Sequence, residues 1–187
     1  GIIAIELRDG DKLVGVEITS GEDDIMLFSA NGKSIRFKEA DVRAVGRTAI
    51  GVRGIRLADK DEVVSLIVAE PENPILTATE KGYGKRTALD EYRSQARGGA
   101  GVISIKTSVR NGKVVGAIQV TDEDEMMLIS NKGTLVRARA SDVSIIGRNT
   151  QGVTLINIAK AEKLVSVAKI AETDEEESEG ENQTVEE

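Results

Sequence analysis

The chain has 187 residues, of which 40% are hydrophobic, 30% charged and 2% aromatic, and it contains no Cys, His or Trp. Without these residues there is no disulfide, no thiolate zinc site and no mechanism that needs a histidine base or a cysteine nucleophile. No apolar run approaches the ~20 residues of a membrane-spanning helix, and charges interrupt the N-terminus where a signal peptide needs an apolar core. The net charge of −7 would by itself argue against a nucleic-acid partner.

The first 50 residues hold four stretches rich in Val, Ile, Leu and Phe, at 2–7, 12–19, 24–30 and 34–38. Their partial alternation of apolar and polar residues predicts short β-strands. Asn31-Gly32 predicts a type I′ hairpin between the last two, because both residue types tolerate a positive φ. No segment up to Ile170 shows a long helical period, so an α/β domain with crossover helices is the weaker alternative.

The same pattern returns along the chain. Similar apolar segments open at Gly1, Gly51, Gly101 and Gly152, and the later landmarks keep their distance from that glycine. We therefore expect repeats at 1–50, 51–100 and 101–151 and a half repeat at 152–170. Because the chain begins in mid-pattern without Met, we also expect it to be a piece of a longer protein.

Four short antiparallel strands in each repeat are what one blade of a propeller-like assembly requires. A single small sheet leaves one face exposed, so neighbouring blades must stack to complete the core. The sequence therefore predicts an all-β, propeller-like fold of about three and a half blades over residues 1–170.

The last 17 residues, 171–187, hold nine of the 32 acids and none of the 25 bases. With Val185 as its only large aliphatic residue, this segment is predicted to be a disordered acidic tail. Residues 1–170 then carry 23 acids and 25 bases, a net charge of +2. The acidity belongs to the tail, which we expect to compete with any polyanionic partner for the basic part of the chain.

Basic residues recur at two places in each full repeat: on the fourth predicted strand and in the loop that closes the repeat. Around an axis, such positions form a line of positive charge along the outer edge, where forked guanidinium groups suit the phosphates of duplex DNA. We predict DNA contacts at Arg36, Lys38, Arg47, Lys85, Arg86, Arg97, Arg137, Arg139 and Arg148.

Structural explanations stay open beside this prediction. The loop arginines could equally form salt bridges between blades or hold loop carbonyl groups. The basic pairs on the strands could protect exposed sheet edges from aggregation. Two acidic clusters, Glu22-Asp23-Asp24 and 122–125, are predicted to be solvated turns on the side away from DNA.

Several stretches resemble the C-terminal domain of the bacterial DNA gyrase A protein: 51–57 (GVRGIRL), 77–87 (TATEKGYGKRT), 101–106 (GVISIK) and 146–153 (IGRNTQGV). The resemblance covers essentially all of residues 1–170. It implies a β-pinwheel, a propeller-like disc with DNA wrapped around its basic rim.

The resemblance also implies a role in the gyrase holoenzyme, an ATP-hydrolysing type II topoisomerase that introduces negative supercoils. The partners would be double-stranded DNA, the rest of the gyrase A protein, and the gyrase B protein, in a heterotetramer. ATP and Mg would lie on the gyrase B protein, with no cofactor, small-molecule substrate or membrane contact here. The expected location is the bacterial cytoplasm, in association with the chromosome.

The chain departs from the family pattern in two respects. The family's wrapping motif, the gyrase A box, reads Gln-Arg-Arg-Gly-Gly-Lys-Gly, whereas residues 95–101 keep that frame with Ala96 and Ala100 at two basic positions. The domain with the catalytic tyrosine is missing, and neither Tyr83 nor Tyr92 matches that tyrosine. We therefore expect no catalytic residue in this chain.

Two other functions are compatible with these observations. One is that of the related C-terminal domain of topoisomerase IV, which selects DNA geometry rather than wrapping DNA. The other is that of a non-enzymatic propeller that binds proteins and recruits basic partners through its acidic tail.

Overall fold

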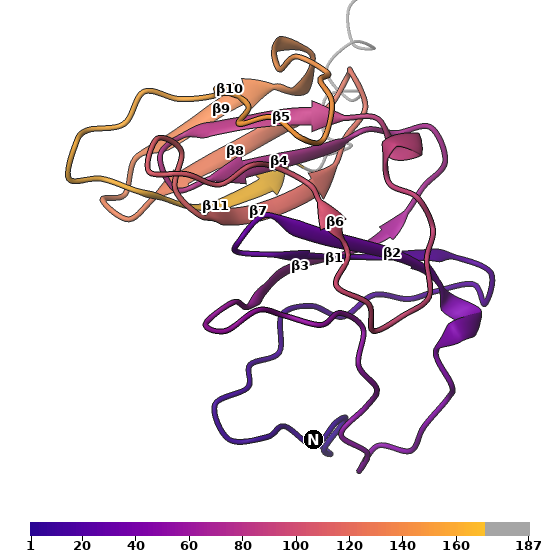
Figure 1. The fold of residues 1–187 in the computed structure, drawn as a ribbon. Helices are drawn as coiled ribbons and strands as arrows, with labels where there is room; N and C mark the ends of the chain where they lie inside the picture. The colour runs from indigo at the N-terminus through magenta and orange to yellow at the C-terminus, as the bar shows by residue number, and fades with distance from the viewer. Residues whose placement is uncertain (171–187) are drawn as a thin grey trace, which may run out of the picture.

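The computed structural model describes residues 1–170, so the predicted tail at 171–187 lies outside the described residues. This part of the chain is built from short strands and three single-turn 3-10 helices (Figure 1). The strands are β1 (Asp24–Ser29), β2 (Lys33–Lys38), β3 (Val63–Ala69), β4 (Ile75–Thr79), β5 (Tyr83–Thr87), β6 (Val102–Ile103), β7 (Val114–Gln119), β8 (Glu125–Ser130), β9 (Leu135–Arg139), β10 (Val153–Thr154) and β11 (Leu164–Lys169). The 3-10 helices are η1 (Glu39–Asp41), η2 (Leu89–Glu91) and η3 (Ala140–Asp142).

The strands form three antiparallel sheets, which confirms the all-β prediction. The first sheet has the order β3-β1-β2-β6, the second β10-β5-β4-β7 and the third β11-β8-β9. Each of the first two sheets contains strands from three successive sequence repeats. Its central hairpin comes from one repeat, a longer strand comes from the next repeat, and a two-residue edge strand comes from the repeat after that. Every sheet is thereby tied to its neighbours by the path of the chain.

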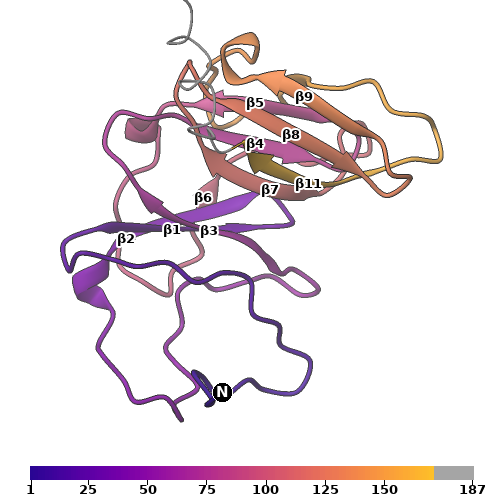
Figure 2. The same cartoon turned by 180° about the vertical axis from the view of Figure 1, so that it is seen from behind.

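Residues 1–23 form no strand, so the predicted strands at 2–7 and 12–19 are wrong, whereas those at 24–30 and 34–38 are confirmed as β1 and β2. The cause is the pairing scheme. The later equivalents of 12–19 are β3, β7 and β11, and each pairs with the first strand of a hairpin that precedes it. Residues 1–11 form no hairpin that could receive 12–19, and Figures 1 and 2 show this segment as a loop beside the first sheet.

The hairpin turns differ from the predicted type I′ turn. Between β1 and β2, the Gly32 amide donates to the Ser29 carbonyl over 3.0 Å, and Gly32 has φ +82°. Asn31 is not among the residues with positive φ, which a type I′ turn requires at both central positions. The turn instead has a single left-handed residue, which is the glycine that donates the closing hydrogen bond. Gly82 and Gly133 take the same role in the next two hairpins.

The glycines that open the third repeat and the half repeat are required by a close approach of two backbones. Gly101 has φ +68°, and a Cβ atom there would lie 2.2 Å from the Ser34 carbonyl oxygen. Gly152 has φ +80°, and its Cβ would lie 2.5 Å from the carbonyl oxygen of Gly84. Any side chain at these points would push the incoming strands β6 and β10 away from β2 and β5.

The sheets stack face to face through apolar side chains. Met26 and Phe28 of β1 pack with Tyr92 between the first and second sheets, and the Phe28 and Tyr92 rings meet edge to face with centroids 6.1 Å apart. Leu76 of β4 and Leu128 of β8 lie in the cluster between the second and third sheets. Strand β3 packs against β7, and β7 against β11, so these strands form the inner side of the stack.

The opposite face of the first sheet also carries apolar residues, among them Ile35 and Phe37 of β2 and Ile55 of the following loop. Within residues 1–170, loop segments cover this face, and a cavity of about 450 Å³ lies against it. We call it the lower face of the first sheet, after its position in Figure 1.

Candidate nucleic-acid interface

The outer side of the stack consists of β2, β5 and β9, of the two-residue edge strands β6 and β10, and of two loops that run along β2 and β5. We call residues 92–101 rim loop 1 and residues 143–152 rim loop 2. The Gln95 amide of rim loop 1 donates to the Arg36 carbonyl, and the Ile146 amide of rim loop 2 donates to the Arg86 carbonyl, both over 2.9 Å. The two loops are thus docked on the strands in the same way, one repeat apart.

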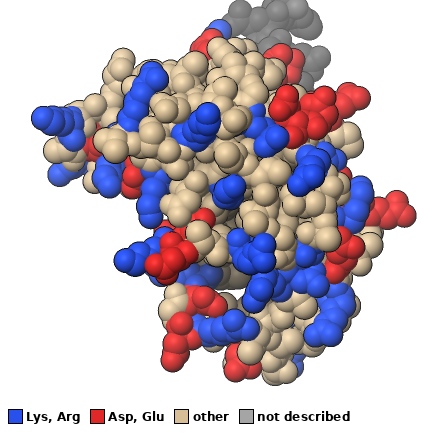
Figure 3. Space-filling view, viewed as in Figure 1, with Lys and Arg blue, Asp and Glu red and all other residues tan. Residues whose placement is uncertain are grey.

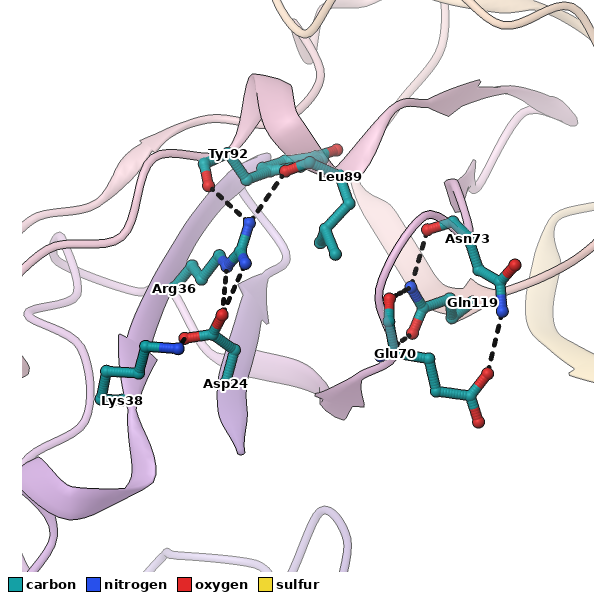
Figure 4. A network of polar contacts seen from close by, with 8 residues as sticks. All are labelled: Asp24, Arg36, Lys38, Glu70, Asn73, Leu89, Tyr92 and Gln119. Carbon is teal, nitrogen blue, oxygen red and sulfur yellow. Dashed lines mark hydrogen bonds and ion pairs between the residues drawn. The ribbon is translucent and has the colours of Figure 1, made fainter. Parts of the chain in front are cut away.

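Arg36 attaches rim loop 1 to the first sheet (Figure 4). One of its terminal nitrogens donates to the carbonyl oxygens of Leu89 and Tyr92 over 3.2 and 3.3 Å. Its other nitrogens hold the Asp24 carboxylate, which also pairs with Lys38 over 3.1 Å. Burial alone would raise the pKa of Asp24, but the two neighbouring cations outweigh it and lower that pKa below its usual value.

Arg86 repeats this arrangement in the second sheet. Its Nε donates to the Val143 carbonyl over 2.7 Å, and its guanidinium pairs with Asp122. Arg137 of β9 pairs with Glu125 in the third sheet. Three acids of the two clusters are therefore partners of the strand arginines: Asp24, Asp122 and Glu125. The prediction of a solvated turn is wrong for Asp24, which lies in β1 and is 9% exposed.

The loop arginines share one contact. Arg47 donates to the Ile3 carbonyl over 3.1 Å, Arg97 to the Arg53 carbonyl over 2.5 Å, and Arg148 to the Ile103 carbonyl over 2.8 Å. The acceptor is in each case the third residue of the same repeat. This is the carbonyl-holding role left open above, and because a guanidinium has five N–H donors it still leaves donors for phosphate.

Lys85 lies fully buried, although it was predicted as a DNA contact. Its ammonium donates to the carbonyl oxygens of Gly147 and Arg148 over 2.6 and 2.7 Å. Desolvation of the charged group, helped by the nearby Arg148, lowers the pKa of Lys85 to about 8. Nearby, the Tyr92 hydroxyl and the Ser104 hydroxyl form a buried hydrogen bond of 3.1 Å.

The remaining predicted residues are exposed to different degrees. Lys38, Arg47, Arg137 and Arg139 lie in exposed positions, Arg97 and Arg148 are partly exposed, and Arg36 keeps about a fifth of its side chain exposed. Figure 3 shows Lys and Arg side chains spread over the viewed face, from the upper sheets to the lower loops. The structure places these side chains along the outer side, except Arg47, which lies in the loop between η1 and β3, and it brings none of them to a single point. Their contacts with DNA stay predictions.

Sequence reasoning did not foresee the burial of Lys85 or the role of Gln119. The Gln119 side chain donates to the carbonyls of Glu70 and Asn73 and accepts from the Glu70 amide, holding the turn that joins the first sheet to the second (Figure 4). A signal for Lys85 was present, because its equivalents in the other repeats are Ile35 and Val136, both apolar. Gln119 has no such repeated signal.

The sequence profile described as "DNA gyrase C-terminal domain, beta-propeller" matches residues 1–20, 23–70, 73–121 and 124–171. The chain belongs to this family. Three of the matched segments begin one or two residues before the first strands of the three sheets, β1, β4 and β8. The family's propeller description thus agrees with the stacked sheets.

Related proteins point the same way. The chain is 62% identical over 172 residues to the DNA gyrase A protein of Klebsiella oxytoca, an alignment that covers 92% of this chain and 20% of that protein. It is 58% identical over 177 residues to the equivalent protein of Escherichia coli strain K12, covering 95% of this chain and again 20% of the relative. The chain thus spans about a fifth of the length of the curated relatives it matches.

Two solved structures are similar in fold. A structure of a DNA gyrase A C-terminal domain gives a TM-score of 0.84 at 31% identity, covering 91% of this chain and 58% of that one. A crystal structure of the C-terminal domain of DNA topoisomerase IV gives the same TM-score at 26% identity, covering 89% and 52%. The shape is therefore shared by both enzymes, and the family match and sequence identity indicate gyrase. No helix within residues 1–170 is long and apolar enough to cross a membrane.

Proposed function

We propose that this chain, as a member of the gyrase C-terminal domain family, binds double-stranded DNA along its outer side and wraps it. The observation that carries the proposal is the recurrence of basic side chains at equivalent outer positions of successive repeats, in a chain whose relatives are DNA gyrase A proteins. Wrapping bends DNA at a cost of several kcal/mol, so many phosphate contacts must act together. Contacts spread over successive sheets meet that need, whereas a single cluster would not.

Within the whole protein, we propose that the wrapped DNA supports ATP-dependent negative supercoiling by a gyrase holoenzyme. The rest of the gyrase A protein would cleave and rejoin DNA, and the gyrase B protein would bind ATP and Mg. This part of the chain would contribute DNA geometry and no catalytic residue. Its location would be the bacterial cytoplasm, on the chromosome.

The test is a change in linking number. The full-length gyrase A protein is bound to nicked circular DNA, ligase seals the nick, and the topoisomers are counted after the protein is removed. Wrapping predicts a shift that grows with protein concentration. Replacement of Arg97, Arg139 and Arg148 by Gln should abolish most of the shift.

The matched control removes three exposed bases that lie outside the strands and rim loops of the outer side, by replacing Lys81, Lys113 and Lys132 with Gln. This variant loses the same charge and should keep the shift. Equal loss in both variants would mean that only total charge matters. Duplex binding without any shift would favour the role that selects DNA geometry in topoisomerase IV, and no duplex binding at about 50 mM salt would favour a protein-binding propeller.

A further inference from the structure

Lys85 occupies a position that the repeat reserves for an apolar side chain. Its equivalent in the first sheet, Ile35, is fully buried in an apolar cluster, and its equivalent in the third sheet is Val136. An ammonium in such a place loses its water, which is costly unless protein groups replace the lost hydrogen bonds. The carbonyl groups of Gly147 and Arg148 provide that replacement.

These contacts make rim loop 2 the more strongly held of the two rim loops. Lys85, Arg86 and Thr87, three successive residues of β5, donate from their side chains to four carbonyl groups of the loop. The acceptors are the carbonyls of Val143, Ile146, Gly147 and Arg148. In rim loop 1 the corresponding residues of β2 are Ile35, Arg36 and Phe37, so only the arginine can donate, and Ile35 instead lies beside Gly99 of the loop.

Of the two residues whose carbonyls Lys85 holds, Arg148 is the one with a charged side chain. Arg148 offers its carbonyl to Lys85 and donates from its guanidinium to Ile103 of β6, the outer strand of the first sheet. Glu91 lies 3.8 Å from the Arg148 Nε and adds a third charge to this group. Rim loop 2 therefore spans the junction of the first two sheets, and the course of its backbone sets where the partly exposed Arg148 side chain stands.

We propose that Lys85 is a positioning residue for DNA binding, which fixes rim loop 2 and with it Arg148 without touching DNA itself. The role rests on the proposed DNA-binding function. With no exposed surface, the ammonium of Lys85 is out of reach of a phosphate. By drawing two carbonyl oxygens inward, it also keeps their negative dipoles from the side that a polyanion would approach.

The first test needs no DNA. In Lys85→Met, amide hydrogen exchange should accelerate in peptides that cover 145–150 of rim loop 2. Peptides that cover 94–99 of rim loop 1 serve as the internal control and should exchange as in the wild type. Equal acceleration in both loops, or none in either, overturns the claim that Lys85 fixes rim loop 2.

The second test is a double-mutant cycle on the salt dependence of duplex binding by the full-length gyrase A protein. The plot of log K against log salt has a negative slope, and loss of one phosphate contact reduces the magnitude of that slope by about 0.9. If Lys85 acts through Arg148, then Lys85→Met, Arg148→Gln and the double variant should all show that same single reduction. Lys38→Met, which removes an exposed lysine of the outer side, should instead add its own effect to that of Arg148→Gln.

Two results would contradict the positioning role, and a third would overturn the proposed function on which it rests. A reduction of about 1.8 in the double variant would mean that Lys85 meets a phosphate directly. A wild-type slope in Lys85→Met would mean that its burial serves stability alone. Absence of salt-dependent duplex binding by the wild type would overturn the proposed function itself, and the hydrogen-exchange test would then still decide whether Lys85 holds the loop.

Discussion

The junction between the first and second sheets and the lower face of the first sheet are built from equivalent positions of successive repeats, yet their chemistry differs. At the junction the repeat places Lys85, Tyr92 and Ser104, which are buried and hydrogen-bonded. At the lower face the corresponding positions hold Ile35, Val42 and Gly54, none of which has a polar side chain. The same backbone thus accommodates a polar and an apolar version of one interface.

The difference shows which features are common to the repeats and which belong to a single junction. Arginines hold loop carbonyls in both regions, as Arg97 and Arg148 do, so this contact belongs to the fold. The buried lysine belongs to one junction only, where the loop backbone turns two carbonyls inward to meet it. A polar group is therefore tolerated in this position only together with its acceptors.

Exchanging the buried polar and apolar residues between the two regions should reduce the free energy of unfolding most at the lower face. Ile35→Lys puts an ammonium into an apolar cluster, and we expect the free energy of unfolding to fall by on the order of 4 kcal/mol. The reciprocal Lys85→Ile removes two hydrogen bonds but also the cost of desolvating a charge, so about 1–2 kcal/mol is expected. Urea denaturation of both variants measures the asymmetry. Equal losses would show that the two sites do not differ in the way described.

The next largest effect concerns the strand arginines. Arg86 is 5% exposed and holds the Val143 carbonyl, so Arg86→Met should cost about 2–3 kcal/mol of unfolding free energy. Arg137 is the same position of the third sheet with 65% of its side chain exposed, and Arg137→Met should cost less than about 0.5 kcal/mol. Thermal or urea unfolding checks both, and a large cost at Arg137 would contradict the account.

The pH dependence of stability should also distinguish the junction. Lys85 has its pKa lowered to about 8 against an ordinary value of 10.5, while Arg148 and Glu91 face it with opposite charges. Between these values the unfolded chain binds more protons than the folded protein, so stability rises with pH through this group. Relative to Lys85→Met, the wild type should gain about 1 kcal/mol between pH 8 and pH 9. A constant difference between the two proteins over that range would show that Lys85 is not desolvated.

The smallest expected effect is at the buried hydroxyl pair. Tyr92→Phe keeps the ring against Phe28 and removes the hydrogen bond to Ser104, which should cost about 1 kcal/mol or less. Val42, the equivalent residue at the lower face, has no hydroxyl group. Val42→Ala therefore serves as a reference that loses packing contacts and no hydrogen bond. Urea unfolding of the two variants separates the contributions, and a neutral Tyr92→Phe would mean that the pair adds no stability.

The repeat made the architecture predictable, because glycines, hairpins and strand patterns recur at a fixed spacing. Strand pairing across repeats was not predictable in the same way, and this is why residues 12–19 were wrongly expected to form a strand. The turn type was missed because a left-handed glycine alone satisfies the hairpin, with no demand on Asn31. The burial of Lys85 could have been inferred from Ile35 and Val136, but its acceptors are backbone groups, which no residue type reveals.

The most direct measurement of the central claim is the salt dependence of duplex binding by the full-length gyrase A protein with and without its outer bases. Each phosphate contact adds about 0.9 to the magnitude of the negative slope of log K against log salt. The account predicts a steep slope for the wild type and a slope lower by about 2–3 when Arg97, Arg139 and Arg148 are replaced by Gln. It predicts an unchanged slope when Lys81, Lys113 and Lys132 are replaced instead. Equal slopes in the two variants would contradict the assignment of the outer side as the DNA-binding surface.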